Sequence, residues 1–169
     1  MASWRSETVG SYRAGRSWRR VDAHVARVDD LLPGEVDASK RLVLVLVGSF
    51  DLRATVPLEY AWRRAARERR ALHVAVDEAG LWALGERWME LARSLPLFTV
   101  EDDGGIARSV ASVVELELAT FDEVVVLAGR IGLGRRVHRL LHDRTADAIS
   151  TALSGMPRVV TAITTVATT

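Results

Sequence analysis

Apolar residues beyond about residue 40 occur in two alternating patterns. Six consecutive apolar residues from Leu42 to Val47 end at Gly48, as expected of a strand that is covered on both faces. Shorter apolar runs predict four further strands, at residues 71–76, 96–100, 121–127 and 158–166. The intervening segments place apolar residues at helical spacing and predict four helices, at residues 53–70, 81–94, 106–118 and 137–153.

Five strands separated by four helices predict an α/β fold with one open, parallel sheet and helices on both faces. Parallel neighbours need crossover connections, and these are almost always right-handed. In such sheets, ligands bind beyond the carboxyl ends of the strands, where the strand order reverses. We expect the loops at residues 48–53 and 128–136 to flank that point.

Residues 1–40 differ from the rest of the chain, and we treat residues 41–169 as a separate α/β domain. Residues 1–20 carry five arginines and one glutamate, with Trp4 and Trp18 among them. Residues 19–32 place four apolar side chains at helical spacing, which predicts a short amphipathic helix ending at Pro33-Gly34. This helix could cap the domain, pair with another copy or pack against a partner.

The composition is typical of a globular protein, at 49% hydrophobic and 27% charged residues. The chain has no cysteine, which excludes disulfides and thiolate metal sites and fits a cytoplasmic location. No apolar run approaches the roughly 18 residues that a membrane-spanning helix needs. A net charge of +1 gives no reason to expect nucleic acid as a partner.

The loop predicted after the fourth strand combines glycines with arginines. Its glycines allow close backbone approach, and the start of the next helix presents free N–H groups to an anion. Arginine side chains add positive charge, so the loop favours a phosphate-bearing ligand. The residues concerned are Gly129, Arg130, Gly132, Gly134, Arg135 and Arg136. The alternative is a solvated basic turn whose glycines only reverse the chain.

Catalytic and metal-binding patterns are weak, and we expect a protein that is not an enzyme. The sequence lacks the nucleotide-binding P-loop and the nucleophile-elbow motif, and nothing pairs a nucleophile with a base. His138 and His142 lie one helical turn apart beside Asp143, but no second cluster completes a metal site, so we expect no metal. His73 lies within a strand and is expected to be a core residue.

From about residue 41 onward the chain resembles a universal stress protein domain. More narrowly, it is similar to the C-terminal domain of some bacterial amino-acid/polyamine/organocation permeases. The stretches that carry the resemblance are "LVLVLVGSFD", "ALHVAVDEA", "FDEVVVLAGRIGLGRRVHRLLHDRTADAISTAL" and "MPRVVTAITTV". It implies an adenine nucleotide alpha hydrolase-like fold and a regulatory or sensory role in the cytoplasm, with a membrane transporter as partner. Some permeases with such tails import potassium and are regulated by cyclic di-AMP.

The sequence departs from the ATP-binding pattern of that family, which is Gly-x2-Gly-x9-Gly-Ser/Thr. Gly129 and Gly132 match the first pair, but His142-Asp143 stands where glycine and a hydroxyl residue would hold phosphate. Gly48-Ser49 stands where ATP-binding members place an aspartate that faces the adenine. We therefore predict a phosphate-bearing ligand such as cyclic di-AMP, bound by Gly48, Ser49, Gly129, Arg130, Gly132, Gly134, Arg135, Arg136 and His142.

Two other functions stay open at this point. The chain could be a stand-alone universal stress protein that binds ATP or AMP, or a ligand-free adaptor that works through dimerisation. Residues 158–166 are rich in β-branched side chains and should form an edge of the sheet. We expect two such edges to pair in a homodimer, as the resemblance also implies.

Overall fold

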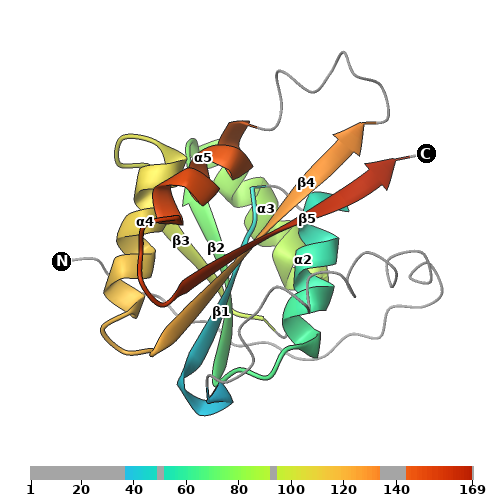
Figure 1. Ribbon diagram of the computed structural model, residues 1–169. Coiled ribbons are helices and arrows are strands. Elements are labelled where there is room, and N and C mark those ends of the chain that lie inside the picture. The colour runs from blue at the N-terminus through green and yellow to red at the C-terminus, as the bar shows by residue number, and fades with distance from the viewer. Residues whose placement is uncertain (1–36, 49–51, 92–94, 134–143, 169) are drawn as a thin grey trace.

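The computed structural model describes residues 37–48, 52–91, 95–133 and 144–168, and these form one parallel five-stranded sheet. The strand order is β3-β2-β1-β4-β5, so the predicted fold class is confirmed (Figure 1). The strands are β1 (Arg41–Leu46), β2 (Glu68–Ala75), β3 (Leu97–Glu101), β4 (Glu123–Leu133) and β5 (Val159–Thr168). The helices that follow the first four strands are α2 (Leu52–Arg63), α3 (Glu78–Leu91), α4 (Ile106–Glu117) and α5 (Arg144–Leu153).

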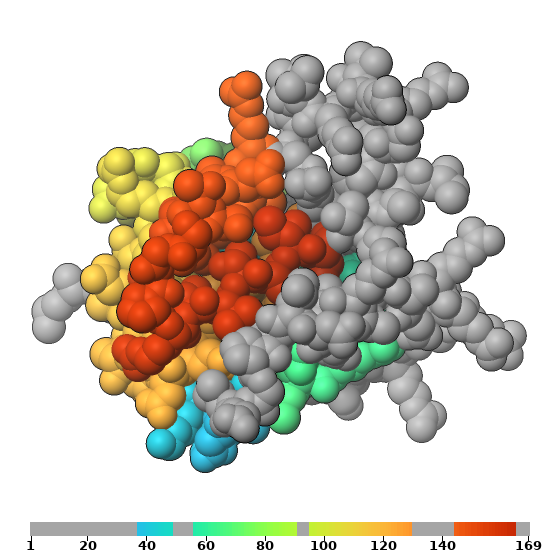
Figure 2. All heavy atoms as spheres, viewed as in Figure 1, coloured from blue at the N-terminus to red at the C-terminus, as the bar shows by residue number. Residues whose placement is uncertain are grey.

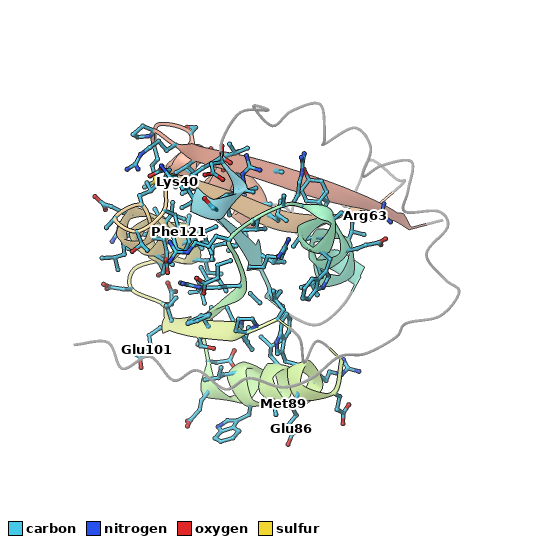
Figure 3. The ribbon with its side chains drawn as sticks, turned by 90° about the horizontal axis from the view of Figure 1, so that it is seen from below. Lys40, Arg63, Glu86, Met89, Glu101 and Phe121 are labelled. Carbon is cyan, nitrogen blue, oxygen red and sulfur yellow. The ribbon has the colours of Figure 1, made fainter. Side chains whose placement is uncertain are left out.

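Two hydrophobic cores, one on each face of the sheet, hold the helices in place. Val43 and Val45 of β1 point into the core beneath α2 and α3, while Leu42 and Leu44 point into the core beneath α4 and α5. The side chains therefore alternate between two buried faces. Figure 3 shows α2 and α4 on opposite sides of the strands. None of the described helices combines the length and apolarity required to cross a bilayer.

The first helix is shorter than the pattern predicted. We expected a helix over residues 53–70, but α2 ends at Arg63 and residues 68–70 already belong to β2. Backbone pairing with β1 places residues 68–70 in a strand, since Glu68 lies opposite Leu42 and the Arg67 N–H donates to the Arg41 carbonyl. The arginines in this stretch suit a helix by propensity, and tertiary pairing overrides that preference.

A buried ion pair fixes the register of the two central strands at their amino ends. Arg41 of β1 lies opposite Glu123 of β4, and its Nε donates to the Glu123 carboxylate. Both residues are buried, and a second Arg41 nitrogen donates to the Ala65 carbonyl at 3.4 Å. Removal of one partner would leave a buried charge uncompensated.

The aromatic side chains divide between core and surface. Trp88 of α3 is buried, and its indole N–H donates to the Leu95 carbonyl at 2.9 Å. Trp62 of α2 and Trp82 of α3 are exposed, at 48% and 69%. His73 is buried, as predicted.

Candidate functional site

The reversal of strand order falls between β1 and β4, as predicted. β1 is followed in sequence by β2 on one side of it, and β4 is followed by β5 on the other. The crossovers therefore leave in opposite directions, and the carboxyl ends of β1 and β4 mark the switch point beyond which ligands bind in open sheets of this kind. Val45 and Leu127 are the last paired residues of these two strands. Beyond them the chain continues to Gly48 on one side and Gly129 on the other.

Gly48 offers an open backbone at this edge. It is exposed, and a Cβ atom added to it would meet no atom within 4 Å. A ligand can approach its peptide groups directly. Ser49, the second predicted ligand residue of this loop, lies outside the described residues.

His73 of β2 contacts the backbone just after the end of β1. Its Nδ1 lies 2.8 Å from the Val47 carbonyl oxygen, and because a carbonyl can only accept, Nδ1 carries the proton. The Val47 N–H still donates to the Leu72 carbonyl, as in a parallel ladder. The imidazole thus binds the carbonyl just before Gly48. Sequence reasoning identified His73 as a core residue and missed this contact, since only the register of β1 against β2 places the two together.

The prediction of a loop at residues 128–136 is wrong for residues 128–133. Residues 128–133 continue β4 and pair with β5, so Gly129, Arg130 and Gly132 lie in a strand. Their register partners in β5 are Thr164, Thr165 and Ala167 respectively. The long β-branched run of β5 offers ladder partners well beyond the end of β1, and this outweighs the turn preference of the glycines.

The extended strands form a two-stranded arm past the rest of the sheet. β1 pairs with β4 only up to Leu127, whereas the β4–β5 pairing continues to Leu133 and Thr168 (Figure 1). At its base the Thr164 hydroxyl donates to the Ala128 carbonyl at 3.3 Å. Gly129 lies two residues beyond the last β1–β4 pair, whereas Arg130 and Gly132 lie further out along this arm. The remaining predicted residues, Gly134, Arg135, Arg136 and His142, lie outside the described residues.

An acidic turn follows β3 at the same edge of the sheet. The Asp102 carboxylate accepts from the Gly105 N–H at 2.8 Å and from the Ser109 hydroxyl at 3.3 Å. Gly104 and Gly105 take φ values of 84° and 116°, a region that favours glycine. Asp102 therefore shapes the start of α4.

The groups whose pKa is perturbed lie at the opposite edge. The hydrogen bond from the Ser39 hydroxyl holds the pKa of Asp37 below its usual value. Burial lowers the pKa of Arg70, but hydrogen bonds and charges from Glu68 and Glu117 outweigh it and raise the pKa overall.

Arg70 also lines a hollow of about 340 Å³ with Phe98, Leu116, Glu117 and Thr120. Within the described ranges, no cluster of three metal-ligating side chains occurs.

A family comparison identifies the domain. Residues 39–166 match the model of the KimA potassium transporter C-terminal domain, which covers the whole sheet except the last residues of β5. The chain belongs to this family. The resemblance to a permease C-terminal domain is confirmed, and the likeness to universal stress proteins stays a prediction. No curated protein matches the sequence. The family is one of transporter C-terminal domains.

Proposed function

We propose that this chain is a non-catalytic, cytoplasmic regulatory domain of a potassium transporter and that it binds cyclic di-AMP between β1 and β4. The observation that carries the proposal is the reversal of strand order between β1 and β4, with Gly48 and Gly129 beyond their carboxyl ends, in a member of the KimA C-terminal family. Open backbone at the carboxyl ends of parallel strands suits a phosphate-bearing ligand.

The arginines supply the charge that a cyclic dinucleotide requires. Such a ligand carries two phosphodiester groups, and guanidinium binds phosphate oxygens in a bidentate manner. Arg130 belongs to β4, and Arg135 and Arg136 follow it closely in the sequence. Each charge-assisted contact would contribute about 1.5–3 kcal/mol to binding. His142 completes the proposed set.

Ligand preference distinguishes the proposed function from the two alternatives, a stand-alone universal stress protein and a ligand-free adaptor. A stand-alone universal stress protein would bind ATP or AMP through the second half of the family motif, where this chain has His142-Asp143. A ligand-free adaptor would bind none of these molecules. A thermal-shift panel with ATP, AMP, cyclic AMP and cyclic di-AMP distinguishes the three, and we expect stabilisation by cyclic di-AMP alone. Stabilisation by ATP alone supports the first rival, and no shift supports the second.

Homodimerisation is part of the proposed function. β5 is an edge strand and pairs only with β4 within the described sheet, so its second edge is open to another chain. A second copy could add its own β5 antiparallel to the first and satisfy both sets of backbone groups. A dimer of regulatory domains would join two copies of the transporter.

A further inference from the structure

The outer side of α3 exposes two large apolar side chains. Trp82 is 69% exposed and Met89 is 44% exposed, and their spacing of seven residues places them on one side of the helix, two turns apart. Gly85 lies between them, and a Cβ atom added there would meet no atom within 4 Å. Leu84 and Trp88 hold the other side of the helix in the core. The helix backbone is therefore open to an approaching chain between the two exposed side chains.

Carboxylates surround these two side chains. Glu78 and Glu86 lie one turn before and one turn after Trp82, and Glu90 adds a third exposed carboxylate. Among the described residues, none of these three glutamates forms an ion pair. Arg87, the one basic residue of α3, lies about 140° around the helix axis from Trp82. The acidic–aromatic face, as we call this surface, consists of Glu78, Trp82, Glu86, Met89 and Glu90.

Strand β3 adds a carboxylate on the same face of the sheet. Leu97 packs against the core beneath α2 and α3, and side chains alternate along a strand, so Glu101 also lies on the α3 side. Glu101 is exposed and has no ion pair within the part of the chain that the structure describes. Figure 3 shows Glu86 and Met89 on the side of α3 that faces away from the sheet. The surface around α3 is therefore negatively charged.

This charge selects among the molecules that could cover the exposed rings. A second copy of the same face would bring carboxylates against carboxylates, and a lipid or nucleic-acid phosphate would be repelled in the same way. Guanidinium groups, in contrast, pair with carboxylates and stack on the face of an indole ring. The surface therefore fits a segment that combines arginines with aromatic residues.

Residues 12–20 of this chain have that composition. They read "YRAGRSWRR", with four arginines, two aromatic residues and no carboxylate, and they lie outside the described residues. We call them the basic segment.

The basic segment can reach the acidic–aromatic face of its own chain. α3 runs from the carboxyl end of β2 back to the amino end of β3, so its last turn lies at the edge where Asp37 precedes β1. Residues 21–36 can span up to about 55 Å when extended. The helix itself is roughly 21 Å long. The length of the connection therefore does not limit docking.

We propose that the basic segment docks on the acidic–aromatic face of the same chain. Its arginines pair with the glutamates of the face and stack on the Trp82 ring. Trp18 packs against the Met89 side chain, whose thioether suits contact with a ring. This docking uses neither the proposed ligand site nor the open edge of β5 and is independent of the proposed function.

Disulfide trapping in the 169-residue chain tests the docking. The chain has no cysteine, so two introduced cysteines are its only thiols. S17C/A79C joins the basic segment to an exposed position on α3. The control S17C/S112C joins it to an exposed position on α4, which lies beside α5 on the other face of the sheet (Figure 2).

We expect S17C/A79C to form a disulfide within one chain at least about tenfold faster than the control, because docking raises the effective concentration of the two thiols. The difference should shrink as salt is raised. Equal rates for the two pairs would overturn the proposal. Disulfides between two chains, which electrophoresis without reductant separates by mass, would assign the segment to a second copy and would also overturn it.

Charge reversal at exposed positions gives a second test with the same thiols. E78R/E86R in the S17C/A79C chain should abolish its advantage over the control, and so should R16E/R19E. All four changes together bring opposite charges back into contact and should restore most of the rate. A chain with all four changes that stays as slow as either double variant would show that these charges do not hold the segment on α3.

Discussion

His73 on β2 donates a hydrogen bond from Nδ1 to the carbonyl oxygen of Val47, 2.8 Å away, at the residue where β1 leaves the sheet. Val47 and His73 are both buried, so the carbonyl has no ready replacement from water. The next residue is Gly48, which belongs to the proposed ligand site. The imidazole is therefore well placed to fix the start of the ligand loop.

Loss of this donor should loosen the loop. We expect His73→Leu to lower the free energy of unfolding by about 1–3 kcal/mol, because a buried carbonyl loses its partner. Amide exchange at Gly48 should accelerate, as measured by hydrogen–deuterium exchange. His73→Asn keeps an N–H donor at a similar position and should restore much of the protection. Identical exchange in the two variants would show that the hydrogen bond does not hold the loop.

The Arg41–Glu123 pair provides a stability test at the other end of the strands. Glu123→Ala should lower the free energy of unfolding by about 3–5 kcal/mol, since it leaves the Arg41 charge buried and unpaired. The double variant Arg41→Met with Glu123→Leu should recover most of that loss, because apolar residues replace both charges. Urea unfolding of the three proteins measures both effects. A double variant less stable than Glu123→Ala would mean that the pair itself stabilises the fold.

The fold was largely predictable because each buried strand is a short apolar run with a helix after it. The errors lie where pairing overrides local preference. The sequence predicts Arg67 to Arg70 as the end of a helix, and only the register of β2 against β1 shows otherwise. The sequence predicts Gly129 and Gly132 as loop residues, and only the pairing of β4 with the full length of β5 shows that they lie in a strand. Both outcomes depend on contacts between distant segments, which the spacing of apolar residues does not encode.

The candidate site was predictable only in part. The alternation of strands and helices predicts a parallel sheet, in which ligands bind where the strand order reverses, and the expected position between the first and fourth strands is the observed one. The contact between His73 and Val47 could not be predicted, because a histidine in an apolar strand gives the same pattern whether or not its ring binds a carbonyl.

Edge pairing through β5 predicts the assembly state. We expect both the full chain and a chain beginning at Ser39 to be dimers in solution, because the open edge of β5 is apolar and uncharged from Val159 to Thr168. Multi-angle light scattering measures the mass directly. Monomers in both cases would exclude the pairing. A dimer that forms only after truncation would show that residues before Ser39 cover the edge.

ATP binding should be weak because of two residues near α5. His142 and Asp143 occupy the places of the glycine and hydroxyl residue that hold phosphate in ATP-binding relatives of the universal stress protein type. We expect no heat of binding at micromolar ATP, and an increase in affinity for His142→Gly with Asp143→Ser. Tight binding of ATP by the unmodified chain would remove the basis for preferring a cyclic dinucleotide.

Titration calorimetry with cyclic di-AMP tests the regulatory-domain proposal most directly. We expect the unmodified chain to bind and the Arg135→Ala with Arg136→Ala variant to lose about 3–6 kcal/mol of binding free energy, two charge-assisted contacts. The matched control, Arg87→Ala with Arg108→Ala, removes equal charge from exposed positions on α3 and α4 and should bind as the unmodified chain does. Saturable binding that is lost only in the first variant is the predicted result. No binding by the unmodified chain, or unchanged affinity in the first variant, would contradict it.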